Sequence, residues 1–222
     1  MKVTGDQALT ITNALSAEIT TVDASESTGG LTLSAAPGVT LGVTFTGGSG
    51  NDAVTGTAAG NDVISTGAGN DTITMTSLNV LDTIDGGDGS DTLSISQAIA
   101  SATILGGVSN IETITLTSSA TITLAADISA TTFNFVDTDD QVLVLDQGYT
   151  NATTVLLATY LGGDDADPAD KVDNSMANIA LTVQANTAGL DGPAGALTLT
   201  GGTGTDTLLS LIHISEPTRP RI

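Results

Sequence analysis

Residues 47–55 read GGSGNDAVT, and the same order of residue types, Gly-Gly-x-Gly-x-Asp-x-apolar-x, recurs at 86–94 as GGDGSDTLS and at 201–209 as GGTGTDTLL. Three looser copies lie between the first two: TAAGNDVIS at 57–65, TGAGNDTIT at 66–74, and SLNVLDTID at 77–85, which keeps only the aspartate and the apolar residue. Clusters of Gly, Asn and Asp also form ordinary β-turns. Five nearly consecutive units in one register favour a repeat architecture over unrelated turns.

Each nine-residue unit predicts a turn followed by a short strand. Its glycines reach positive φ angles without a Cβ clash, so successive carbonyl oxygens can point to one side. In the strand, side chains alternate between the two faces, and the apolar residue points inward; these residues are Val54, Ile64, Ile73, Ile84 and Leu93. Two units then complete one coil of a flattened solenoid, and alternate units stack. The aspartates should therefore form two columns: a first column of Asp52, Asp71 and Asp91, and a second column of Asp62 and Asp82.

The stacked turns predict calcium sites. Ca²⁺ takes about six to eight oxygen ligands at roughly 2.3 to 2.6 Å, which carboxylates and backbone carbonyls supply. Without a cation, each column is a line of like charges about 4.8 Å apart, or a small multiple of that distance, which opposes coiling. We therefore expect folding to be coupled to calcium. The candidate carboxylate ligands are Asp52, Asp62, Asp71, Asp82, Asp91 and Asp206, and the candidate carbonyl ligands are those of Gly47, Gly48, Ser49, Gly50, Gly67, Gly69, Gly86, Gly87 and Gly89.

The units differ in how well they keep the pattern. Thr57 and Ala58 stand where unit 57–65 should have its leading glycines, and residues 78–81 replace the turn of unit 77–85. Thr66 replaces the first glycine of unit 66–74. Calcium at Asp82 is therefore the least supported, and the site at Asp62, in the same column, is weakened with it.

This nonapeptide resembles the unit of the repeats-in-toxin (RTX) family. The resemblance covers residues 47–94 and 201–208. It implies an all-β fold, a right-handed parallel β-roll or β-helix solenoid. It also implies export in one step by type I secretion, through a C-terminal signal that this chain does not include. The segment GGVSNIETITLT at 106–117 is similar to the transition that follows such arrays in bacterial surface-layer and large adhesin-like proteins.

Composition fits a secreted solenoid. The 222 residues carry a formal net charge of −21, no cysteine, no tryptophan and only 2% aromatics, whereas a compact core of this size usually holds more aromatic area. The charge points to cations as partners and away from nucleic acid. Residues that follow Met1-Lys2 form no apolar signal-peptide segment, and no apolar run is long enough for a membrane helix. We expect an extracellular or cell-surface protein without membrane insertion.

Short Val, Ile, Leu and Thr-rich runs on both sides of the repeats predict further strands. They lie at 9–12, 19–22, 31–33, 43–46, 111–117, 121–124, 132–136, 142–145, 154–157, 179–183 and 197–200. The chain divides into β-solenoid coils or a spacer at 1–46, the calcium β-roll at 47–94, a Thr-rich β spacer with longer coils at 95–200, and the start of a second array at 201–208. Whether 95–200 continues the roll or forms a separate β domain is open. An acid-rich stretch between residues 160 and 174 favours a solvated loop over an additional calcium site.

Residues 209–222 break the pattern. The segment LSLIHISEPTR at 209–219 is identified as the in-frame translation of a sequencing adapter, an artefact to be set aside before fold reasoning. A short amphipathic tail is the competing interpretation. We expect His213, Arg219 and Arg221 to carry no chemistry, and Asp206 to lack a stacking partner in this chain.

Two functions from different classes follow. Without the histidine of the tail there is no His-based triad or zinc-protease motif, so we expect no enzyme. The favoured function is a calcium-binding structural segment of a secreted surface-layer protein that self-associates or contacts cell-surface polysaccharide. The alternative is an adhesive module that recognises a glycan, ice or another cell. Its support is a recurring Thr-x-Thr pattern at 10–12, 72–74, 113–117, 121–123 and 198–200, although exposed threonine is ordinary on β-strands.

Overall fold

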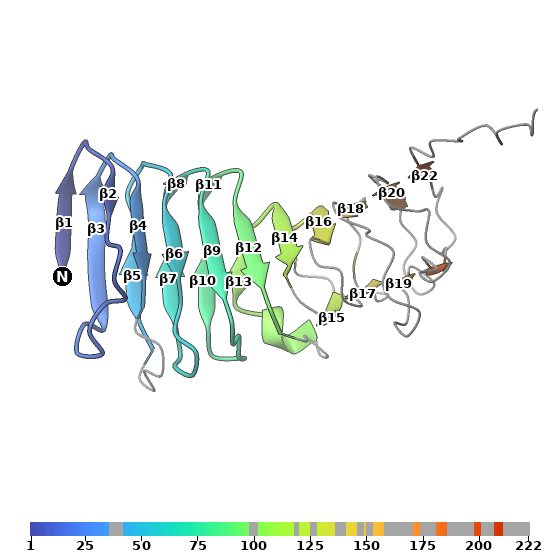
Figure 1. The fold of residues 1–222 in the computed structure, drawn as a ribbon, viewed down its shortest axis with the longest axis horizontal. Coiled ribbons are helices and arrows are strands. Elements are labelled where there is room, and N and C mark those ends of the chain that lie inside the picture. The colour runs from blue at the N-terminus through green and yellow to red at the C-terminus, as the bar shows by residue number, and fades with distance from the viewer. Residues whose placement is uncertain are drawn as a thin grey trace, which may run out of the picture.

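The computed structural model describes residues 1–35, 42–97, 102–117, 120–124, 128–135, 141–145, 149, 153–157, 171–173, 181–185, 198–200 and 207–210. Within these residues the protein is all-β, and every recorded strand pair is parallel. Successive coils stack as a β-solenoid (Figure 1). The predicted fold class, a parallel β-roll or solenoid, is confirmed.

Two sheets form the walls of the repeat region. The first sheet contains β1 (Lys2–Gly5), β3 (Thr21–Ser27), β5 (Thr44–Thr46), β7 (Val63–Ser65), β10 (Thr83–Asp85) and β13 (Val108–Ser109). The second contains β2 (Leu9–Thr10), β4 (Leu31–Ser34), β6 (Ala53–Thr55), β9 (Thr72–Met75), β12 (Thr92–Ile95), β14 (Thr113–Leu116), β16 (Thr132–Phe135), β18 (Thr153–Leu157), β20 (Leu181–Ala185) and β22 (Thr207–Ser210).

Smaller elements complete the coils. Two turn strands pair along one edge, β8 (Ala68–Gly69) with β11 (Asp88–Gly89). Farther along the chain, a four-stranded sheet of β15 (Ala120–Leu124), β17 (Gln141–Leu145), β19 (Lys171–Asp173) and β21 (Thr198–Thr200) takes the place of the first sheet. A short 3₁₀ helix, η1 (Ala102–Leu105), precedes β13. The second sheet runs on through β14 to β22, so the strands after Ser94 continue the same stack.

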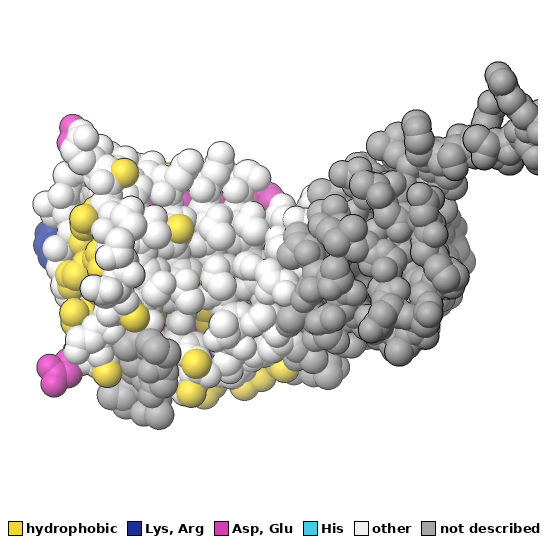
Figure 2. Space-filling model, in the orientation of Figure 1, with side chains coloured by type: hydrophobic (Ala, Val, Ile, Leu, Met, Phe, Trp, Pro, Cys, Tyr) yellow, Lys and Arg dark blue, Asp and Glu magenta, His cyan; other side chains and the backbone are white. Residues whose placement is uncertain are grey.

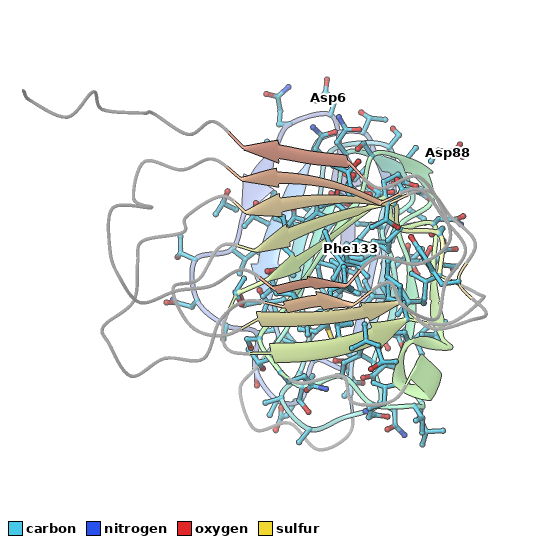
Figure 3. The ribbon with its side chains drawn as sticks, turned by 90° about the vertical axis from the view of Figure 1, so that its right-hand side faces the viewer. Asp6, Asp88 and Phe133 are labelled. Carbon is cyan, nitrogen blue, oxygen red and sulfur yellow. The ribbon has the colours of Figure 1, made fainter. Side chains whose placement is uncertain are left out.

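The core is one column of mostly aliphatic side chains, with three aromatic insertions among the described residues. The apolar residue of each of the five units between residues 47 and 94 is buried, with an exposed fraction of at most 1%; these are Val54, Ile64, Ile73, Ile84 and Leu93. Phe45, Phe133 and Tyr149 are fully buried as well. Seen along the solenoid, Phe133 points into the interior between the sheets, and Asp88 projects from the outer rim (Figure 3). The prediction that these apolar positions point inward is confirmed.

Most strands predicted outside the repeats lie within about two residues of their expected bounds. The strand predicted at 19–22 is an exception, because β3 begins only at Thr21 and continues to Ser27. A turn in which the Ile19 N–H donates to the Ser16 carbonyl at 2.9 Å delays its start, and pairing with β1 and β5 extends it. Strand β22 includes Leu209 and Ser210, the first two residues of the segment identified as adapter. Asp206, residues 211–222 and the acid-rich stretch 161–170 lie outside the described residues.

Candidate metal centre

The repeat aspartates stack in the two predicted columns. Hydrogen bonds from backbone N–H groups to carboxylates of the following coil link the members: Asp52 to Asp71 at 2.7 Å, Asp71 to Asp91 at 2.8 Å, and Asp62 to Asp82 at 2.7 Å. All five side chains are buried, with exposed fractions of at most 3%. In the described part of the face drawn in Figure 2, few acidic side chains are visible.

In the first column, only half of each carboxylate is satisfied. One oxygen of each accepts a backbone N–H from the preceding coil, and Asp52 accepts that of Leu31 at 2.7 Å. The other oxygen, Oδ2 of Asp52, Asp71 and Asp91, is buried and has no donor within hydrogen-bonding geometry. An unsatisfied buried polar atom costs about 1–3 kcal/mol, and a charged one costs more. Three such atoms recur along one column, so the fold repeatedly places a carboxylate oxygen where a donor or a cation is needed.

Burial is the largest influence on the pKa of Asp52 and of Asp91. Desolvation raises the pKa of Asp52 to about 6, the Leu31 N–H opposes the rise, and the charge of Asp71 adds to it. The Gly48 N–H also opposes the rise in the pKa of Asp52, more weakly than the Leu31 N–H does. Burial likewise raises the pKa of Asp91, with the charges of Asp71, Glu112 and Asp85 acting in the same direction. A nearby positive charge would favour the ionised form of these two carboxyl groups.

The glycines at the start of the complete units leave space beside these unpartnered oxygens. A Cβ on Gly47 would meet both Asp52 Oδ2 and the Thr66 carbonyl oxygen of the next coil. A Cβ on Gly86 would lie 2.6 Å from Asp91 Oδ2 and would also meet the Asn110 carbonyl oxygen. At both places a carboxylate oxygen and a carbonyl oxygen from adjacent coils converge on a spot that any side chain would fill.

Some carbonyls of the predicted ligand set already accept hydrogen bonds within the protein. The Gly48 carbonyl accepts the Ala68 N–H and the Gly67 carbonyl accepts the Asp88 N–H, each at 2.8 Å, so these two oxygens help to stack the coils. The Gly86 carbonyl accepts the Thr66 hydroxyl at 2.9 Å. The remaining predicted carbonyls, those of Gly47, Ser49, Gly50, Gly69, Gly87 and Gly89, lie on the turns of this same edge. Thr66, although it replaces a glycine, does not donate to Asp71.

The second column is satisfied by protein donors. Asp62 Oδ1 accepts the Val43 N–H at 2.8 Å and the Thr57 hydroxyl at 2.9 Å, while Oδ2 accepts the Thr57 N–H at 2.7 Å. Thr57 is itself fixed, because its hydroxyl accepts the Gly60 N–H at 3.1 Å. The residue that breaks the glycine pattern in unit 57–65 thus supplies the hydrogen bonds that Asp62 needs.

Asn79 does the same for Asp82. Its backbone N–H donates to Asp82 Oδ2 at 2.7 Å, and its side-chain amide donates to Asp82 Oδ1 at 3.0 Å and to the Gly60 carbonyl at 2.8 Å. One amide group therefore bridges a carboxylate and a turn carbonyl of the preceding unit in that column. Burial raises the pKa of Asp82, and the hydrogen bonds from Asn79 and Asp62 oppose that rise.

Sequence reasoning missed a carboxylate at the end of the first column. Glu112 Oε2 accepts the Asp91 N–H at 2.7 Å, the same bond that Asp71 and Asp91 make to the coils before them. The available signal was position: Glu112 directly precedes Thr113, which pairs with Thr92, so it stands where the next aspartate of the column would stand.

The first column fits a hard cation such as Ca²⁺. Its donors are carboxylate and carbonyl oxygens, the ligands that such a cation prefers, and its unpartnered Oδ2 atoms supply charge. Within the described residues, no group of three or more His, Cys, Asp or Glu side chains could hold a metal ion. Any ion here would therefore depend on backbone carbonyls and water for most of its ligands.

No protein-family model, curated protein or solved structure that we compared with the chain matches it. Among the described residues, no helix has the length and apolar character needed to cross a membrane.

Proposed function

We propose that this chain is a calcium-binding structural segment of a secreted bacterial cell-surface protein, of the surface-layer type, whose coils close on calcium after export. The observation that carries the proposal is the row of three buried, unpartnered Oδ2 atoms on Asp52, Asp71 and Asp91. Calcium would supply the missing partner and neutralise the column. At the low free calcium of a cytoplasm, the same charges would oppose coiling and keep the segment exportable.

The proposal places calcium on the first column alone. In the second column, Thr57 and Asn79 already donate to both oxygens of Asp62 and Asp82. A calcium there would have to displace these donors. This assignment narrows the ligand set expected from sequence, which included Asp62 and Asp82.

A calcium titration of the full chain tests the proposal. Circular dichroism and thermal melting would be recorded in chelator and then at rising calcium, with magnesium as the competing cation. We expect a cooperative gain of β signal and a higher melting temperature with calcium. A protein whose spectrum and melting temperature ignore calcium would contradict the proposal. Light scattering and electron microscopy at millimolar calcium test lattice formation; a folded, calcium-loaded chain that stays monomeric would overturn the surface-layer part alone.

A second candidate function, an adhesive module, has its own observation in the second sheet. One position is held in register across all ten strands and is threonine in each of them except β6, where it is Ala53. Its members are Thr10, Thr32, Ala53, Thr72, Thr92, Thr113, Thr132, Thr154, Thr182 and Thr207. We call this row the threonine ladder. As far as Thr154, where its side chains are described, they are exposed or half-buried.

The ladder favours a ligand with its own regular repeat. Its groups recur about every 4.8 Å along the solenoid, and a parallel row two residues farther along the strands, including Thr55, Thr74 and Thr115, lies about 6.7 Å away. The rows offer hydroxyl and methyl groups without charge and without the aromatic faces on which sugars commonly stack. An ice surface fits this chemistry better than a free glycan.

Ice-recrystallisation assays with the calcium-saturated chain test this candidate. The variant T72K/T92K would place two long charged side chains in the middle of the ladder, and we expect it to abolish the activity. The control T44K/T83K carries the same change on exposed positions of the first sheet. Absence of activity in the wild-type chain, or equal activity in both variants, would remove the candidate; binding on a glycan array instead would replace ice by a carbohydrate.

A further inference from the structure

We propose that Asp91 and Glu112 form a further calcium site, one coil beyond the last complete nonapeptide, and that Glu112 ends the calcium-binding edge. This inference rests on the proposed function, because it extends the first column by a residue that the repeat pattern does not include.

Strand register brings the two carboxylates together. Thr92 pairs with Thr113, so the residues before them, Asp91 and Glu112, lie on adjacent coils. The Glu112 and Thr113 N–H groups both donate to the Asp91 carbonyl, at 3.2 and 3.0 Å. Glu112 Oε2 then accepts the Asp91 N–H at 2.7 Å. Glu112 thus makes the bond by which each aspartate of the column holds the coil before it.

A shorter turn explains why this residue is a glutamate. The turn between β10 and β12 spans residues 86–91, whereas that between β13 and β14 is reduced to residues 110–112. Asn110 allows the shortening with a left-handed backbone, φ 51°, and its amide donates to Asp85 Oδ1 at 2.7 Å. The backbone at residue 112 is turned so that its N–H meets the Asp91 carbonyl and not a carboxylate of the next coil. The extra methylene of glutamate restores the reach of the side chain.

The second, independent observation lies at Asp91. Its side chain is fully buried, and Oδ2 has no hydrogen-bond donor although Oδ1 is satisfied by the Asp71 N–H. The Asn110 carbonyl oxygen converges on the same glycine-lined spot beside Gly86 as this Oδ2. The spot therefore offers an unpartnered carboxylate oxygen and a carbonyl oxygen, and the Asp91 N–H holds the Glu112 carboxylate on the adjacent coil. All are oxygen donors suited to a hard divalent cation.

The substitution Glu112→Gln removes the charge of the side chain and keeps its length, so it separates a role in ion binding from a role in holding the coils together. The amide oxygen of the new side chain would still accept the Asp91 N–H, so the melting temperature in chelator should stay within about 2 °C of wild type. Calcium binding by the full chain would be measured by isothermal titration calorimetry and equilibrium dialysis. We expect one calcium fewer per chain, or one site weakened at least tenfold. Glu18→Gln, on an exposed turn residue, is the matched control and should bind as wild type does.

Two outcomes would overturn the inference, and they are distinguishable. If wild type binds calcium and E112Q binds the same number of ions with the same affinities, Glu112 is a purely structural end of the column and the proposed function stands. If wild type binds no calcium, the proposed function fails and this site fails with it. The variant Glu112→Asp adds a second measurement: its shorter side chain should lose both the Asp91 bond and the ion, which lowers the melting temperature even in chelator.

Discussion

The side-chain amide of Asn79 lies 2.8 Å from the carbonyl oxygen of Gly60, a residue of the preceding unit on the same edge. The same nitrogen is 3.0 Å from Asp82 Oδ1. It links a carboxylate to a turn carbonyl of a neighbouring coil, which is what a bound cation does in a stack of acidic turns. The two columns therefore differ: side-chain donors add links between coils along the second, while the first leaves one oxygen of each carboxylate without a partner.

Replacing Asn79 by alanine should destabilise the chain independently of calcium. The change removes two side-chain hydrogen bonds: the buried Gly60 carbonyl loses the donor of Asn79, and Asp82 Oδ1 keeps only the Asp62 N–H. We expect a cost of about 1–3 kcal/mol. Urea unfolding in chelator and in calcium should show the same loss. Asn61→Ala is the control, because Asn61 is exposed on the turn of the same column. A loss seen only in calcium would mean that Asn79 acts through a metal site.

Conversion of aspartate to asparagine should affect the two columns in opposite ways. The new amide in D71N would keep an oxygen for the Asp52 N–H while removing an unpaired buried charge, so this variant should melt at or above the wild-type temperature in chelator but lose most of its stabilisation by calcium. In D62N, the amide would face the Thr57 and Val43 donors, at a cost of about 1–3 kcal/mol with the calcium response retained. The melting temperatures of both variants with and without calcium test this prediction. An equal response of the two variants to calcium would contradict the assignment of calcium to one column.

The two aspartate columns could be predicted from the sequence, because the nonapeptide sets both the length of each coil and the register between coils. The inward apolar residue and the aspartate two positions before it are local features, so stacking alternate units was enough to align Asp52, Asp71 and Asp91. The hydrogen bonds from Thr57 and Asn79 to the second column could not be predicted from the sequence pattern. Each looked like a defect in a glycine turn, and only the coil geometry shows that their donors reach the aspartates.

Glu112 was missed for a related reason. It lies outside the repeat in a turn of different length, and its equivalence to an aspartate depends on the pairing of Thr92 with Thr113. The end of β3 was misplaced because pairing with β1, not local composition, extends the strand to Ser27. Both errors arise where tertiary register overrides a local pattern.

Steric crowding between stacked turns should make Gly87 less tolerant of a side chain than Gly5. Both have positive φ angles, +91° and +127°, so alanine is strained at either place. A Cβ at Gly5 has nothing within 4 Å, while one at Gly87 meets the Gly67 carbonyl oxygen. We expect G5A to cost about 1–2 kcal/mol and G87A clearly more, with weaker calcium binding as the turns are pushed apart. Equal unfolding free energies for the two variants would show that strain alone, and not stacking of the turns, sets the cost.

Stability without calcium should fall as pH rises from about 4 to 7. Burial raises the pKa of Asp52 to about 6 and also raises those of Asp82 and Asp91, so over this range the native state holds protons that the unfolded chain has released. The free energy of unfolding then decreases with pH, by up to about 2–3 kcal/mol for Asp52 alone.

Calcium should reverse this trend, because it binds the ionised carboxylates and its affinity grows as they lose protons. Melting temperatures at pH 5 and pH 7.5, in chelator and in millimolar calcium, measure both slopes. The variant D52N should flatten the slope in chelator, since it removes a carboxyl group whose pKa burial raises to about 6. A chelated protein that melts higher at pH 7.5 than at pH 5 would mean that the buried carboxylates of the first column are not what limits its stability.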